Sequence, residues 1–193
     1  MTTNRLFSIT ILLVLDVVAA VISSCDKANN NGDNNGFDRS AMLENYADNI
    51  IQPNFADLQT EATALQAAVT AFTATPNQQN LSALQTAWKE AFIAYQHVNA
   101  FNFGPGETFL GTVTQRLATF PVDTATLEGY IDAADYTLDN LNRDTRGFLG
   151  MEYLIFDKGG DDNAVIDRYT TAGDAENRKA YLEAVAEIGR AHV

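Results

Sequence analysis

The chain has 193 residues, a formal net charge of −13 and a pI near 4.3, and 46% of its residues are hydrophobic. This length and apolar content suffice for one folded domain. The acidity argues against nucleic-acid binding, because a phosphate backbone is bound by Lys and Arg side chains that displace its counterions. It also argues against a polybasic membrane-surface protein. The single cysteine, Cys25, excludes an intrachain disulfide.

Residues 1–24 have the pattern of a lipoprotein signal peptide. Arg5 supplies a basic start, residues 9–22 are nearly all apolar, and small residues directly precede Cys25. This order is typical of a cleaved secretion signal rather than of a membrane-spanning helix. Small residues followed by Cys resemble a bacterial lipobox, in which Cys25 is lipidated and becomes the first residue of the mature protein. An ordinary cleaved signal with an incidental Cys is the alternative.

Residues 25–37 are rich in Asn, Gly and Asp, which predicts a flexible tether. Residues 38–187 have the apolar period of helices and predict an all-α fold, an up-and-down helical bundle without a significant sheet. An apolar stripe from Phe55 to Phe72 predicts the first long helix, which ends at Thr75-Pro76. Pro53 is expected to kink or break its upstream extension, because a proline ring clashes with the carbonyl four residues earlier.

Further helices are predicted downstream. The second runs from about residue 80 to the Gly104-Pro105-Gly106 turn, and the third covers roughly residues 124–142. The residues of the third helix that are expected to face inward are Leu127, Ile131, Ala134, Leu138 and Leu141. A fourth helix is predicted from Arg146 to about Phe156, a loop at residues 159–162, and a fifth helix from near Asp174.

The last six residues, 188–193, are interpreted as a non-native tail. They follow a helix that is still in mid-pattern at Glu187, and they match the translation of a common sequencing adapter. This hypothesis predicts that the natural protein continues beyond residue 187, and a natural short tail is the alternative. His192 therefore receives no functional interpretation.

Three motif segments follow one another along the chain: residues 88–105, which start at Trp88 and end in a Phe-Gly-Pro turn, residues 120–123, which read Phe-Pro-Val-Asp, and residues 146–156. Together they resemble the imelysin family over about residues 40–187. The residues that carry this structural signature are Trp88, Gly104, Pro105, Pro121, Gly147, Phe148 and Tyr153. The resemblance implies the N-terminal half of a double helical bundle, in a secreted or lipid-anchored protein associated with iron acquisition.

Two positions depart from the family's pattern. Its third segment normally reads Gly-x-His-x-x-Glu, where His and Glu share one helix face and can hold a metal. Here Leu149 replaces the His, while Glu152 remains. Near the end of the Trp helix the family often has Glu, but this chain has Asn99, an uncharged oxygen ligand that suits a transition metal poorly. Similar losses occur in the branch that resembles iron-regulated protein A, and this chain resembles that branch.

Three residues remain as candidates for holding a ligand or a metal: Glu152, Asn99 and His97. Glu152 is expected to point toward the core, either as a structural carboxylate with a hydrogen-bond partner or as a pocket residue. His97 lies one residue off the apolar stripe of the second predicted helix, which contains Tyr95 and Val98, so a surface position is expected. No catalytic residue is assigned. The cofactor is not identified, and the resemblance is compatible with iron or another divalent metal.

These features favour a lipid-anchored, non-catalytic binding protein of the bacterial envelope that acts in iron- or haem-linked uptake. Leu149 weakens the alternative of an imelysin-type metallopeptidase, because a leucine side chain cannot ligate a metal. A third interpretation is a scaffold that partners an outer-membrane transporter. The expected partners are the membrane, through the anchor, and an outer-membrane receptor. The expected location is the periplasmic face or the cell surface of the outer membrane.

Overall fold

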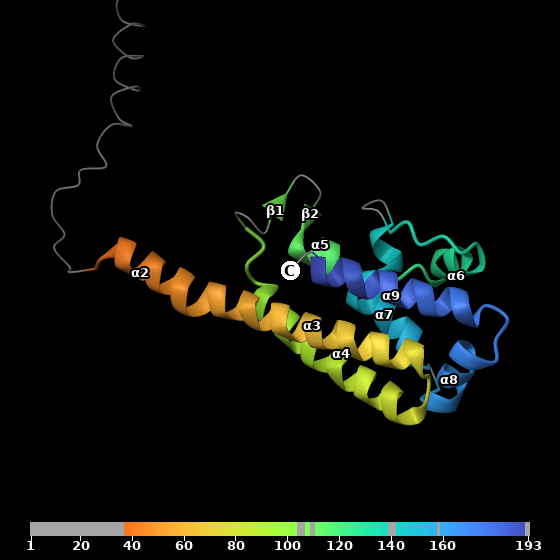
Figure 1. Cartoon of the computed structure of the whole chain (residues 1–193). Coiled ribbons are helices and arrows are strands. Elements are labelled where there is room, and N and C mark those ends of the chain that lie inside the picture. Colours follow the sequence, from red (N-terminus) through yellow and green to blue (C-terminus); the bar gives the residue numbers. More distant parts are fainter. Residues whose placement is uncertain (1–36, 104–106, 109–110, 139–141, 158, 192–193) are drawn as a thin grey trace, which may run out of the picture. The chain divides into compact units, whose positions relative to one another are not determined.

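The computed structural model describes residues 37–103, 107–108, 111–138, 142–157 and 159–191 (Figure 1). The predicted signal peptide, most of the tether, Cys25, Gly104 and Pro105 lie outside the described residues. The chain divides into two units, residues 1–42 and 43–193, and the helical bundle belongs to the second. Within the described ranges, none of the helices combines the length and the apolar content that a membrane crossing requires.

The first long helical segment consists of three consecutive elements. α2 (Arg39–Tyr46) leads into a π-helical turn, η2 (Ala47–Ile51), and then into α3 (Gln52–Ala74). The interruption predicted at Pro53 is therefore a widened turn rather than a break, and Tyr46 and Ile51 keep right-handed helical dihedrals. In a regular helix, the ring of Pro53 would clash with the carbonyl of Asn49. Asn49 lies within the π-helical turn, so the widening of this turn relieves the clash.

α3 and α4 (Gln78–Val98) form a helical hairpin and lie side by side in Figure 1. Asn77 caps α4, because its side chain accepts a 2.9 Å hydrogen bond from the backbone N–H of Asn80. Both predicted apolar stripes are confirmed. The buried residues on the stripe of α4 are Leu81, Leu84, Ala87, Trp88, Ala91, Ala94, Tyr95 and Val98.

A short ladder and a short helix follow α4. β1 (Glu107–Thr108) pairs antiparallel with β2 (Gly111–Thr112), and α5 (Val113–Leu117) begins directly afterwards. Thr112 and Gln115 form a capping box at the start of α5. With two residues in each strand, the ladder leaves the chain in the all-α class, as predicted.

The predicted third helix is too long. α6 covers Thr124–Asp132 and ends in a Schellman motif, in which the N–H groups of Ala134 and Asp135 bond to the carbonyls of Ile131 and Tyr130. Ala134 adopts a φ of 52° and is exposed, so its predicted inward position is wrong. Leu138 is buried as predicted, and Leu141 lies outside the described residues.

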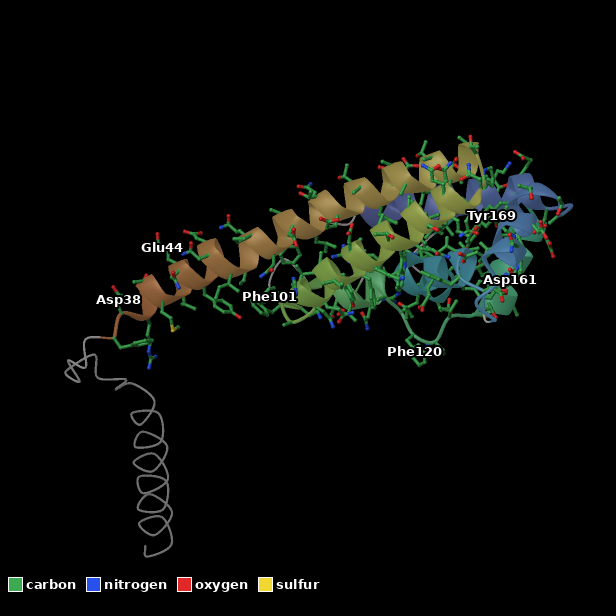
Figure 2. The ribbon with its side chains drawn as sticks, turned by 90° about the horizontal axis from the view of Figure 1, so that it is seen from below. Asp38, Glu44, Phe101, Phe120, Asp161 and Tyr169 are labelled. Atoms are coloured by element: carbon green, nitrogen blue, oxygen red, sulfur yellow. The ribbon has the colours of Figure 1, made fainter. Side chains whose placement is uncertain are left out.

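The last part of the bundle contains η4 (Arg143–Thr145), α7 (Gly147–Ile155), α8 (Asp162–Thr170) and α9 (Ala175–Ala191). α7 and the start of α9 agree with the prediction. α8 has no counterpart among the predicted helices. Asp161, which is labelled in Figure 2, caps it by accepting a 2.9 Å hydrogen bond from the N–H of Asn163. The interpretation of residues 188–193 as a non-native tail stays a prediction.

α9 packs against α3, α7 and α8 and completes the core. Two buried tyrosine hydroxyls join the helices: Tyr181 donates to the carbonyl of Thr145 at 2.8 Å, and Tyr169 donates to that of Leu154 at 3.1 Å. A side-chain ion pair adds to these contacts, because Arg178, 5% exposed, binds both carboxylate oxygens of Glu128 on α6. The core thus fixes α6 and α7 relative to the long helices.

Candidate functional site

An open groove of about 450 Å³ lies along one face of α7. Its walls are formed by the segment before and at the start of α6 and by α7 with the residues that follow it. The lining residues are Phe120, Pro121, Val122, Thr124, Leu149, Glu152, Tyr153, Phe156 and Asp157. The second and third motif segments, which are separated in sequence, therefore meet at one surface.

Glycines allow α7 to approach its neighbours closely. Gly147, the first residue of α7, has a φ of 71°, and a Cβ there would collide with the carbonyl oxygen of Leu117. A Cβ at Gly150 would lie 2.9 Å from the carbonyl oxygen of Thr145. Glycine at these two positions therefore lets α7 pack onto the end of α5 and onto η4, and this packing orients the groove face.

Asp123 fixes the opposite wall. Its carboxylate accepts hydrogen bonds from the backbone N–H of Thr126 at 3.0 Å and from the Thr126 hydroxyl at 2.7 Å, which caps α6. The backbone bond and then the hydroxyl bond of Thr126 lower the pKa of Asp123 below its ordinary value. The N–H of Asp123 donates to the carbonyl of Asp144 at 2.9 Å. The Pro-x-Asp motif thus anchors the segment that carries Phe120 and Val122.

Residues of the first motif segment pack against the buried side of the groove residues. Trp88 is buried, as predicted, and its indole N–H donates a 2.9 Å hydrogen bond to the carbonyl of Phe148. Its ring stacks on Phe92 at 5.1 Å and meets the edge of Phe156 at 5.4 Å between centroids. Because Phe156 also lines the groove, these aromatic contacts connect α4 to the site.

The structure corrects the expected orientation of Glu152. Its side chain is exposed and lines the groove, whereas Phe148, Met151 and Ile155 are buried. The buried side of α7 is centred on these apolar residues, and the adjacent side, which contains Leu149 and Glu152, faces the groove. The Glu152 carboxylate has no hydrogen-bond or ion-pair partner in the described part of the chain. The expectation of a buried structural carboxylate is therefore wrong.

Asn99 is engaged elsewhere. Its side-chain oxygen accepts hydrogen bonds from the hydroxyls of Thr114 and Tyr95, the latter at 3.2 Å, and from the Asn102 amide at 3.4 Å. Burial, partly offset by the hydrogen bond with Thr114, raises the pKa of Tyr95. Asn99 is therefore a structural acceptor at the end of α4, and it is not among the residues that line the groove.

His97 is exposed, as predicted. It is also not among the groove residues, so the three candidate ligands Glu152, Asn99 and His97 are not brought together there. Across the ranges that the structure describes, no cluster of three or more His, Cys, Asp or Glu side chains could hold a metal ion.

The sequence did not predict the roles of several groove residues. Phe120 is 83% exposed and projects from the segment between α5 and α6 (Figure 2), and its place in the Phe-Pro-Val-Asp motif was the available signal. Tyr153, predicted only as part of the structural signature, donates a 2.7 Å hydrogen bond to Glu128. Asp157 forms a 3.2 Å ion pair with Arg168 on α8, and no sequence pattern linked these two residues.

Comparisons with known proteins agree with the motifs. The model of the family described as Imelysin (Peptidase_M75) matches residues 51–191. Iron-regulated protein A of Synechococcus elongatus is 25% identical over 141 residues, which cover 72% of this chain and 36% of that protein. A crystal structure of an iron-regulated protein A precursor from Parabacteroides distasonis superposes with a TM-score of 0.66 at 24% identity, and covers 79% of this chain and 42% of its own.

The chain thus spans less than half of the length of both relatives. The likeness to the solved structure shows the same helical fold. The family model covers the whole of α3 and continues to the end of α9. Fold, motifs and family match all agree: the chain belongs to the imelysin family.

Proposed function

We propose that the protein is a lipid-anchored, non-catalytic binding module of the bacterial envelope that acts in iron-linked uptake. The observation that carries this proposal is the groove itself: two family motif segments build it, while Leu149 stands where the family's motif His is expected. The name of the Synechococcus relative supports the link to iron. The lipobox-like residues before Cys25 support the anchor and an envelope location, with an outer-membrane receptor as the proposed partner.

The groove offers a binding surface rather than a reaction centre. Leu149, Val122 and Phe156 supply apolar contact area, and Glu152 supplies one exposed carboxylate. Burial of apolar surface drives association, and a few polar groups fix the orientation of what binds.

The donor set does not fit the metal that a metallopeptidase of this family would need. Leu149 has no ligating atom, Asn99 is engaged by Thr114 and Tyr95, and Asp157 is paired with Arg168. Among the described residues that line the groove, Glu152 is thus left as the one carboxylate without a partner, whereas a catalytic zinc typically has three protein ligands. Metal analysis of the purified protein checks this disagreement: stoichiometric, tightly held metal would favour the peptidase alternative.

A complementation experiment tests the proposed function. Deletion of the gene in its host should slow growth under iron limitation, and the wild-type gene should restore growth. L149W, which fills the groove, should fail to restore it, whereas Q59W on the exposed face of α3 should succeed. Both proteins must reach the envelope in equal amounts, and C25S should leave the membrane fraction. Full complementation by L149W would contradict the proposal.

A further inference from the structure

The charge of the groove restricts what it can bind. Glu152 is exposed and has no partner in the described part of the chain. In the part of the chain that the structure describes, two cations near the groove are already engaged. Arg168 is paired with Asp157, and the Lys89 ammonium lies 5.8 Å from the centre of the Phe156 ring. The whole chain has a net charge of −13. An anionic ligand would therefore meet repulsion, and a positively charged group would gain an unshared carboxylate.

The shape of the groove also matters. It is open along its length rather than enclosed, and Phe120 at its edge is 83% exposed. A small molecule is usually bound in a cleft that buries most of its surface. An open apolar trough with an exposed aromatic side chain instead resembles an interface with a protein segment, in which large aromatic residues act as anchors.

From these two properties we infer that the groove is the docking site for a segment of a partner protein that carries a Lys or Arg next to an apolar side chain. The basic group lies beside Glu152, and the apolar side chain packs against Phe120, Val122 and Leu149. This inference rests on the proposed function, because it assigns the class of ligand to the same groove.

Selection from a display library of random heptapeptides on the full mature chain tests the inference. The enriched peptides should contain Lys or Arg within two positions of an aromatic or aliphatic residue. Their affinity is then measured by fluorescence polarisation with one synthetic representative and with its neutral version, in which citrulline or norleucine replaces the basic residue. The neutral version should bind about tenfold more weakly.

Matched variants locate the binding. E152Q should weaken the representative peptide about tenfold, whereas D57N, which removes an exposed carboxylate on α3, should have less than about a twofold effect. F120A should weaken it about tenfold, and I93A, which removes an apolar side chain that is 57% exposed on α4, should not. Circular dichroism confirms that all four variants are folded.

The inference is overturned if no peptide is enriched, if acidic peptides are enriched, or if E152Q and D57N have equal effects. These outcomes leave the proposed function intact as long as L149W still fails in the complementation experiment. Conversely, basic apolar peptides that bind at Glu152, combined with full complementation by L149W, would refute the proposed function and retain the ligand class.

Discussion

The indole N–H of Trp88 donates a 2.9 Å hydrogen bond to the carbonyl oxygen of Phe148 and so connects α4 to the first turn of α7. Both residues are buried, and each ring contacts Phe92. The bond explains why a Trp in the first motif segment accompanies the Gly-Phe pair of the third: one side chain supplies both apolar area and a directed hydrogen bond.

W88F should lower the free energy of unfolding by about 2 kcal/mol, because it removes this hydrogen bond and leaves a cavity beside Phe156. Urea denaturation followed by circular dichroism measures the effect. I93A, on the exposed face of the same helix, should change stability by less than about 0.5 kcal/mol. Equal effects of the two substitutions would show that the Trp88 contact contributes nothing specific.

The ion pair between Glu128 and Arg178 predicts a pH dependence of stability. Partial burial raises the pKa of Glu128, but hydrogen bonds from Arg178 and Tyr153 outweigh it, so the pKa lies below its ordinary value. A lowered folded-state pKa stabilises the fold above the unfolded-state pKa, and this contribution is lost as the pH falls through the folded-state pKa. E128Q should therefore cost about 2 kcal/mol at neutral pH, and less in acid.

Denaturation curves of wild type and E128Q between about pH 7 and pH 3 measure this difference, which should shrink as Glu128 of the wild type becomes protonated. E152Q is the matched control, because Glu152 is exposed and has no partner in the described part of the chain. If the difference between wild type and E128Q stays constant over this range, the pair with Arg178 does not stabilise the fold.

Ala134 predicts a stabilising substitution. It ends α6 with a φ of 52°, a conformation in which a Cβ is crowded and glycine is not. A134G should therefore raise the free energy of unfolding by about 0.5–1 kcal/mol. A133G at the preceding residue, whose φ is −79°, should destabilise the protein instead. Thermal or urea denaturation distinguishes the two outcomes, and destabilisation by both would contradict the assignment of this helix end.

Helix identity could largely be predicted from the sequence, because the apolar period of α3, α4, α7 and α9 reports burial directly. The end of α6 could not, since Ala at a Schellman position lacks the glycine that usually signals it. The start of α8 could not be predicted either, because the Gly-Gly-Asp-Asp stretch favours a loop, whereas Asp161 within it is the N-cap of a helix.

The site was predicted in part. The resemblance located Leu149 and Glu152 on one face of α7, and the groove confirms that they share it. The expectation that Glu152 points toward the core was wrong. Apolar residues flank Glu152 on both sides around the helix, and only tertiary packing decides which of these sides is buried. The engagement of Asn99 depends on Thr114, which lies 15 residues later on α5, and no sequence pattern linked the two residues.

Leu149 and Glu152, one helical turn apart, predict a gain of function. L149H places an imidazole and a carboxylate on the groove face, so Zn²⁺ should bind at least about tenfold more tightly than it does to wild type. Isothermal titration calorimetry measures the affinity. The double variant L149H/E152Q should lose the gain. Equal affinities of wild type and L149H would show that the two side chains do not converge.

The most direct test of the groove as the binding site is the reactivity of a thiol placed in it. L149C and the control Q59C on the exposed face of α3 are labelled with a maleimide, once in intact envelopes and once in purified protein. The parent chain, whose single cysteine is the proposed lipidation site Cys25, supplies the background. If the groove is occupied in the cell, L149C is labelled much more slowly in envelopes than after purification, while Q59C is labelled equally in both. Equal rates for L149C in both settings would contradict occupancy of the groove.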